Sequence, residues 1–549
     1  MKRFDPIILI AIMMLASCGN HPGNTTSEAL DTAALNRIEA ESFIQYVKDL
    51  SADEFLGRKP FTKGDTLAVT YIAEEFERIG LEPGNGEHYF QAVPMVEIMS
   101  TPTTPLTFSK GNSQFSLDHL DDFVIGSKRL TAQVNVPETD VVFAGFGIVA
   151  PEYGWNDYAG LDAKGKTVVV MVNDPGFYDK TLFKGDTMTY YGRWTYKFEE
   201  AARQGATGVL IIHDTDAASY GWNVVRSGWA GPQLSLVTPD NGASRAAFEG
   251  WLTAEATEKL FELAGGADSL ISQAKKPGFK PVELGIKTGI SLKNEFRKSA
   301  SNNVLGKLSG SKYPDEYIIY SAHWDHLGVG EPIDGDSIYN GAIDNASGVA
   351  ALFELAKAFK GAAVPPERSI LFLAVTAEEQ GLLGSAYYAA NPVYPLGKTV
   401  ANINIDALSP IGQTSDVAVV GLGQSDMDDY ARRAAARQNR EVVPGGNPSA
   451  GSFFRSDHFN FAKVGVPALY TGSGKNVIDK DSTEVAALQD AFGKRYHDVS
   501  DEYDETWDVS GMIADIRLVF DIGYSLSQER TFPKWKTGSE FKAIGDARF

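Results

Sequence analysis

Imidazole and carboxylate side chains follow three strand-like runs in the C-terminal half of the chain. Ligands of open parallel sheets bind outside the carboxyl ends of the strands, so side chains at such ends are expected to converge. Neighbouring side chains at a strand end diverge, which lets one of two adjacent glutamates bind a metal while the other faces a substrate as a base. The runs cover residues 317–320, 371–375 and 401–405, and they lead into His323, Asp325 and His326, into Glu378 and Glu379, and into Asp406.

Two further candidate ligands lie outside these strand ends. Asp344 immediately precedes a helical run, where an aspartate taken alone favours a helix N-cap. His497 lies in a polar loop, where a lone histidine would usually be inert. Their combination with the three strand ends favours a metal site, because two neighbouring metal ions need a carboxylate that bridges them and further ligands on each side.

The composition limits which site is possible. The chain has one cysteine among 549 residues, which excludes an intramolecular disulfide and any cysteine-based zinc finger or iron–sulfur site. A metal must therefore be held by histidine, aspartate and glutamate, a donor set that suits a hydrolytic zinc site with open positions. The 71 acidic residues outnumber the 50 basic ones and give a formal net charge of -21. Such a balance argues against nucleic-acid binding and against docking on anionic lipid headgroups.

Strand-like and helical runs alternate from about residue 303 onward, which predicts an α/β fold with a mostly parallel central sheet flanked by helices. The segment 129–295 has its own strand, helix, strand pattern, typical of a compact α/β module. We therefore divide the folded chain into the N-terminal part of one domain (32–128), an inserted module (129–295) and the rest of the first domain (296–549).

The N-terminus predicts an export signal over residues 1–17. Basic residues precede an apolar run that is shorter than the ~20 residues of a bilayer span. Residues 15–18 read Leu-Ala-Ser-Cys and resemble the lipobox of bacterial lipoproteins, which implies a lipid anchor on Cys18. Residues 18–31 would form a flexible tether. We expect an exported lipoprotein, either on the periplasmic side of the cell envelope, with the outer membrane favoured, or at the cell surface.

Five motifs contain the candidate metal ligands. In chain order they are Ala322-His323-Trp324-Asp325-His326, Asp344-Asn345-Ala346-Ser347-Gly348, the run from Ala377 to Ser385, Asn404-Ile405-Asp406 and Tyr496-His497. Together they resemble those of family 28 of the metallopeptidases, the co-catalytic zinc aminopeptidases, a family that also includes glutamate carboxypeptidase. The resemblance implies a zinc-exopeptidase fold of the phosphorylase/hydrolase type, and the inserted module resembles a protease-associated domain.

The resemblance implies two zinc ions per chain. His323 and Asp406 would hold one ion, and Glu379 and His497 the other. Asp344 would bridge the two. All five ligands lie within the motifs that carry the resemblance.

Further roles are implied for residues beside these ligands. A cis peptide bond would precede Asn345, and the side chain of Asp325 would hydrogen-bond the second ring nitrogen of His323. Glu378 would be the general base, and Tyr496 would stabilise the oxyanion.

A second group of family-like residues is expected at the rim of the pocket. Arg455, Ser456 and Asp457 would contact the substrate there. His326, by contrast, is expected to be a structural or supporting residue.

The function implied by the resemblance is hydrolysis of peptide bonds by zinc-activated water, most readily as an aminopeptidase acting on peptide substrates. A carboxypeptidase or dipeptidase of the same family stays open, as does a glutaminyl cyclase, which uses one zinc ion. Retention of His323 and His497 argues against the cyclase, and against a non-enzymatic relative such as the transferrin receptor. The sequence leaves the oligomeric state open.

Overall fold

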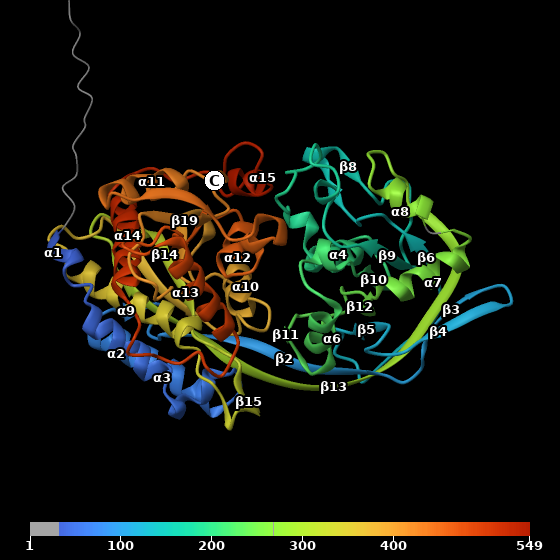
Figure 1. The fold of residues 1–549 in the computed structure, drawn as a ribbon, viewed down its shortest axis with the longest axis horizontal. Coiled ribbons are helices and arrows are strands. Elements are labelled where there is room, and N and C mark those ends of the chain that lie inside the picture. The colour runs from blue at the N-terminus through green and yellow to red at the C-terminus, as the bar shows by residue number, and fades with distance from the viewer. Residues whose placement is uncertain (1–31, 267) are drawn as a thin grey trace, which may run out of the picture.

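Two lobes joined by a long ribbon make up the computed structural model, which describes residues 32–266 and 268–549 (Figure 1). The ribbon consists of β2 (Phe90–Pro102) and β13 (Val282–Leu308), which pair antiparallel from Phe90↔Val304 to Pro102↔Leu292. Figure 1 shows both strands running along one side of the molecule, with the first lobe at the left and the second at the right.

A central sheet forms the middle layer of the first lobe, in the order β13–β17–β14–β18–β21–β19–β20. The four neighbours β17, β14, β18 and β21 pair in parallel. At the two ends of this run, β13 pairs antiparallel with β17, and β19 pairs antiparallel with β21. The three predicted strands coincide with β14, β17 and β18, except that Ile405 follows the end of β18, and the predicted α/β fold with a central sheet flanked by helices is confirmed. The bounds are β14 (Tyr313–His323), β17 (Arg368–Val375), β18 (Thr399–Asn404), β19 (Asp416–Val420), β20 (Glu441–Gly445) and β21 (Ala468–Ser473).

Helices cover both faces of this sheet because its strands are apolar on both sides. Ile318 and Tyr320 pack into one core with the helix α9, whereas Ile319, between them, packs into a second core on the opposite face. The helices are α1 (Thr32–Leu35), α2 (Ala40–Leu50), α3 (Lys63–Ile79), α9 (Ser347–Lys360), α10 (Leu383–Ala390), α11 (Met427–Arg437), α12 (His458–Lys463), α13 (Ser482–Arg495), α14 (Ser510–Gln528) and α15 (Lys542–Asp546).

The second lobe has its own sheet, in the order β5–β12–β10–β9–β6–β13, with the hairpin β3–β4 beside it. Two apolar cores fill the space between this sheet and its helices. The elements are β3 (Leu106–Lys110), β4 (Ser113–Leu117), β5 (Phe123–Gly126), β6 (Gln133–Phe143), β9 (Thr167–Met171), β10 (Gly208–Ile212), β11 (Gln233–Leu236), β12 (Phe248–Leu252), α4 (Trp194–Arg203), α5 (Thr215–Ala218), α6 (Trp222–Ala230), α7 (Ala254–Ala264) and α8 (Asp268–Ala274).

Residues 106–126, which the division by sequence gives to the N-terminal part of the first domain, pack in the second lobe. Strand β5 pairs with β12, and Leu106 and Phe108 of β3 lie in a core of the second lobe. The alternating pattern of a short strand does not indicate which sheet the strand joins. The sequence therefore could not assign residues 106–126 to the second lobe.

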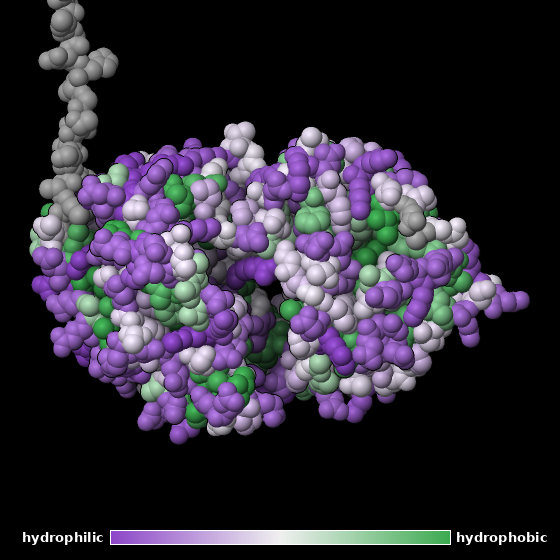
Figure 2. All heavy atoms as spheres, viewed as in Figure 1, coloured by the Kyte–Doolittle hydropathy of each residue, from purple (hydrophilic) through white to green (hydrophobic). Residues whose placement is uncertain are grey.

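The two lobes also touch away from the ribbon. Met188 and the half-buried Tyr190 of the second lobe pack against Phe453, Phe454 and Phe459 of the first. Near them an ion pair of 3.0 Å joins Lys463 of α12 to Glu199 of α4. Figure 2 shows a hollow between the lobes with hydrophilic residues at its edges. The ribbon and this apolar contact therefore hold the lobes together at two separate places.

The predicted signal, the Cys18 anchor and the tether lie outside the described residues. Within residues 32–266 and 268–549, no helix has the length and apolar character to cross a bilayer.

Candidate metal centre

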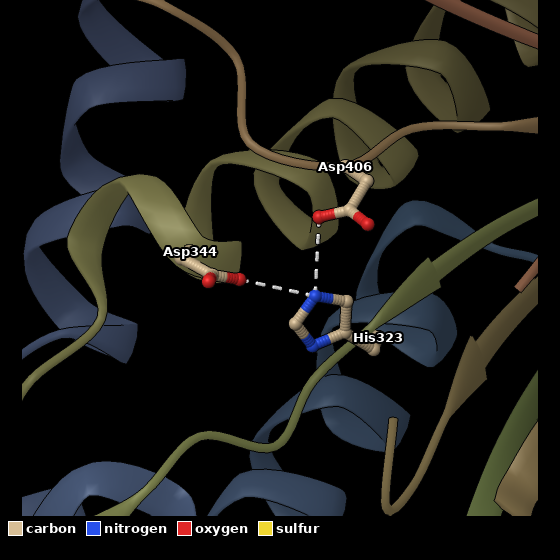
Figure 3. Close-up of side chains that lie close together, drawn as sticks. All are labelled: His323, Asp344 and Asp406. Carbon is tan, nitrogen blue, oxygen red and sulfur yellow. Dashed lines mark hydrogen bonds and ion pairs between the residues drawn. The ribbon is translucent and has the colours of Figure 1, made fainter. Parts of the chain in front are cut away.

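His323, Asp344 and Asp406 form the first group of possible metal ligands (Figure 3). Nε2 of His323, at the end of β14, lies 3.1 Å from Oδ1 of Asp344 and 3.2 Å from Oδ1 of Asp406. Asp406 follows β18 by two residues, and Asp344 lies in the turn before α9. The convergence expected from the strand ends is therefore present for His323 and Asp406.

Glu379 and His497 form the second group around the other oxygen of Asp344. Nε2 of His497 lies 3.3 Å from Oδ2 of Asp344 and 3.0 Å from Oε2 of Glu379. The peptide bond between Asp344 and Asn345 is cis, as predicted. The two oxygens of Asp344 thus face two different histidines, which is the arrangement expected of a bridging carboxylate.

His326 lies closer to the centre than the sequence suggested. Its Nδ1 lies 2.7 Å from Oε1 of Glu379, and it forms a possible ligand group with Asp344 and Glu379. The other ring nitrogen of His326 has no hydrogen-bond partner among the described residues. His326 therefore either orients Glu379 or shares its metal.

The charges of the group fit a divalent cation. Burial raises the pKa of the Asp344 carboxyl, but hydrogen bonds from His323 and His497 outweigh it and hold this pKa well below its usual range. Burial disfavours the charged form of His497, yet its hydrogen bonds with Asp344 and Glu379 raise its pKa to about 10. Positive charge thus stabilises these buried carboxylates. A bound metal would supply that charge in place of the protons on His323 and His497. Imidazole and carboxylate donors without thiolates suit zinc.

Asp325 does not bind His323 in the predicted way. Its carboxylate oxygen lies 4.0 Å from Nδ1 of His323, beyond hydrogen-bond range, and its backbone carbonyl accepts from that nitrogen instead, at 3.1 Å. The buried carboxylate accepts from the backbone N–H groups of Glu378 and Glu379, at 3.0 and 3.4 Å. The Asp325 carboxylate therefore fixes the loop that contains Glu378 and Glu379. The nearer partner of His323 is the backbone carbonyl of Asp325.

Glu378 and Tyr496 flank the candidate ligands. Glu378 is half-buried, and burial raises its pKa well above the usual range, with the negative charges of Asp406 and Glu379 adding to the effect. The ring of Tyr496 stacks on that of His497, with ring centroids 3.9 Å apart, and the residue is 63% exposed. Desolvation of its phenol and the nearby carboxylates raise its pKa, so the hydroxyl stays protonated and can donate.

Two of the three residues expected at the pocket rim point into the protein instead. The buried Ser456 donates to Oδ2 of Asp406 at 2.5 Å, and the buried Asp457 accepts from Ser385 at 2.5 Å. Only Arg455 is exposed, and its guanidinium donates to the carbonyl of Ala450. Ser456 is buried just before α12, so its hydroxyl bonds to the carboxylate of Asp406 and not to solvent.

Sequence reasoning missed Arg58 and Asp501. The guanidinium of Arg58 donates to backbone carbonyls beside the ligands, and the Asp501 carboxylate accepts from the N–H groups of Ile343 and Asp344, at 2.9 and 3.0 Å. Both contact only main-chain atoms of the ligand loops, which no side-chain motif records. Asp501 follows His497 by four residues, and that proximity is the only signal in the sequence.

The C-terminal segment of the chain is similar to a known protein family. Residues 303–520 match Peptidase family M28. The chain is 36% identical over 138 residues to mouse "Aminopeptidase NAALADL1" (24% of this chain, 17% of the relative) and 30% identical over 181 residues to "Aminopeptidase YwaD" of Bacillus subtilis (31% and 35%). It therefore spans less than two thirds of these curated relatives.

The fold of both lobes also has a counterpart among solved structures. The aminopeptidase from Aneurinibacillus sp. strain AM-1 superposes with a TM-score of 0.50 and 21% identity, over 90% of this chain and 95% of that one. This likeness concerns the fold. The family match itself is confined to residues 303–520, which are similar to Peptidase family M28 over less than half of the chain.

Proposed function

We propose that this chain is a zinc-dependent aminopeptidase that releases N-terminal residues from peptides. The observation that carries the proposal is the position of Asp344, whose two oxygens lie 3.1 Å from His323 and 3.3 Å from His497. Asp406 and Glu379 complete a ligand group on either side, so we assign two zinc ions. The relatives named as aminopeptidases in mouse and Bacillus subtilis support the choice of reaction.

The zinc ions, when bound, would lower the pKa of a water molecule and polarise the scissile carbonyl. Glu378 would take the proton of that water and return it to the amine that leaves, a task favoured by its raised pKa. The phenol of Tyr496 would donate a hydrogen bond to the carbonyl oxygen as negative charge develops there. Asp325 and Asp501 hold the backbone of the loops that present these groups.

The test compares aminoacyl p-nitroanilides and peptides that have a free N-terminus with the same compounds acetylated at that amine. An aminopeptidase cleaves only the free forms, because it binds their charged amine. A chelator should abolish this cleavage, and added zinc should restore it. Equal cleavage of the acetylated compounds would refute the aminopeptidase.

The alternative is a carboxypeptidase, and one feature of the lobe interface favours it. Arg193 of the second lobe packs on Gly451, and Arg455 of the first lobe binds the adjacent carbonyl of Ala450. Burial lowers the pKa of Arg193 to about 10, and the charge of Arg455 adds to this. Neither forms an ion pair with a carboxylate of the described chain, so both would be available for a substrate's C-terminal carboxylate. Peptides amidated at the C-terminus test this, because a carboxypeptidase would not cleave them.

We also propose that the second lobe contains a protease-associated domain, taken from the sequence as residues 129–295, and that the protein is an exported lipoprotein anchored through Cys18. The two separate cores of the second lobe support its being an independent module. Mass spectrometry of the mature N-terminus tests the anchor. We expect a lipid on Cys18 and a soluble protein after Cys18→Ser, and an unmodified Cys18 would exclude the anchor.

A further inference from the structure

Arg58 joins three separate segments of the first lobe through backbone carbonyls. Its Nε donates to the carbonyl of Trp324 at 2.8 Å, and Nη2 to that of Gly341 at 2.9 Å. Nη1 donates to Leu50 at 2.7 Å and to Asn340 at 2.6 Å. Trp324 directly follows the ligand His323, and Asn340 and Gly341 lie shortly before the ligand Asp344. One side chain thus holds the two loops that approach the metal centre from different strands.

The charge of Arg58 is buried without a bonded counter-ion. Its side chain is 1% exposed, and no carboxylate of the described residues forms an ion pair with it. Burial lowers its pKa to about 10, and the negative charges of Asp501, Asp325, Asp344 and Glu379 oppose this, so the guanidinium stays cationic at neutral pH. A buried charge is costly unless nearby opposite charges offset it. The carboxylates in and around the metal centre provide that offset.

Two buried carboxylates also hold backbone groups near the proposed ligands, one in the loop before Asp344 that Arg58 contacts and one in the loop after β17. Asp501 accepts from the N–H of Asp344, and Asp325 accepts from the N–H groups of Glu378 and Glu379. Arg58 donates to backbone carbonyls, whereas these two aspartates accept from backbone N–H groups. Together the three side chains fix the backbone of the loops bearing ligands without contacting the ligand side chains.

We propose that Arg58 is a positioning residue of the metal centre, whose guanidinium fixes the backbone before Asp344 and after His323, so that its loss weakens metal binding more than it weakens the fold. Lysine cannot replace it, because an ammonium lacks the planar fork that reaches several carbonyls at once. Changes to groups that orient metal ligands lower metal affinity or activity about 10- to 100-fold.

The chain offers a matched control in Arg368. That guanidinium is also fully buried, at 0% exposure, and it also donates to two backbone carbonyls, those of Leu526 and Thr531. It differs in having a bonded carboxylate, Glu316 at 2.8 Å, and in lying away from the ligand loops. Arg368→Lys therefore disturbs a comparable buried site outside the metal centre.

The experiment measures the zinc dissociation constant of the full chain by competition with a chromophoric chelator. Arg58→Lys should bind zinc about 10- to 100-fold more weakly than wild type, and Arg368→Lys within about twofold of it. Wild-type affinity in Arg58→Lys would overturn the inference, as would an equal loss in both variants. The inference rests on the proposed function in requiring zinc. Zinc binding by the wild type tests that function, and the ratio between variants tests Arg58.

A second measurement needs no variant and covers the case in which Arg58→Lys does not fold. Amide hydrogen exchange is followed in wild-type peptides that cover residues 322–327 and 339–346, with zinc and after chelation. The inference predicts protection in both states, because a backbone that Arg58 fixes keeps its own N–H bonds without the metal, such as those of Ile343 and Asp344 to Asp501. Protection that vanishes with the metal would show that zinc, and not Arg58, positions these loops.

Discussion

The hydroxyl of Ser456 lies 2.5 Å from Oδ2 of Asp406, the oxygen that does not face His323. Ser456 also accepts from the side-chain amide of Asn404 at 2.7 Å, so its hydroxyl is held in one direction. Its neighbours in the chain, Phe454 and Phe459, pack against Tyr190 of the second lobe, with ring centroids 6.2 and 5.1 Å apart. One short segment therefore contacts both the proposed ligand Asp406 and the other lobe.

Ser456→Ala removes the hydrogen bond that orients Asp406. We expect zinc affinity or kcat to fall about 10- to 100-fold, because such supporting bonds set the direction of a ligand. Zinc content and kcat are the measurements. The matched control is Ser369→Ala, since Ser369 is equally buried and its hydroxyl donates to the carbonyl of Pro314. Equal losses in the two variants would mean that Ser456 acts only through packing.

Tyr190→Ala removes the aromatic contact between the lobes, and with it the hydrogen bond from its hydroxyl to Glu199. We expect faster amide exchange over residues 453–459 and zinc affinity reduced about 2- to 30-fold, the usual range of coupling between linked elements. Phe115→Ala, in the hairpin of the second lobe where Phe115 stacks on Phe108, is the control. If both variants leave exchange over 453–459 unchanged, the lobe contact does not support the ligand segment.

Glu378→Gln keeps the shape of the side chain and removes its ability to take a proton. We expect kcat to fall about 10²- to 10⁴-fold, the usual contribution of a general base, while the zinc content stays that of the wild type. Steady-state kinetics and metal analysis of one preparation provide the comparison. Activity within a few-fold of wild type would remove Glu378 from this role.

Zinc should stabilise the first lobe in particular, because every proposed ligand belongs to it. A ligand at 1,000 times its dissociation constant stabilises the folded state by about 4 kcal/mol. In scanning calorimetry with and without a chelator, the transition of the first lobe should shift upward with zinc. The second lobe, with cores of its own, should shift less. A shift confined to the second lobe would place the metal elsewhere.

The sequence predicted those parts of the site that depend on side-chain type and strand order. His323 and Asp406 converge because β14 and β18 are neighbouring parallel strands, and their carboxyl ends share one edge of the sheet. The motifs identified Asp344, Glu379 and His497, and the structure brings these together.

The remaining contacts depend on where main-chain atoms lie after folding. Arg58 and Asp501 bind only backbone groups, and Asp325 uses its carbonyl, not its carboxylate, toward His323. No pattern of residue types encodes such partners. The placement of residues 106–126 in the second lobe was missed for a similar reason, because the pairing of β5 with β12 joins segments far apart in the chain.

If Asp344 bridges two zinc ions, its loss removes a ligand from both, and metal analysis of three proteins measures this. Zinc bound per chain is measured by mass spectrometry after dialysis of the wild type, Asp344→Ala and His497→Ala. We expect two zinc ions in the wild type, close to none in Asp344→Ala, and one in His497→Ala, because only Asp344 serves both ions. A wild type with a single zinc ion, or an Asp344→Ala variant that keeps as much zinc as His497→Ala, would rule out the bridge.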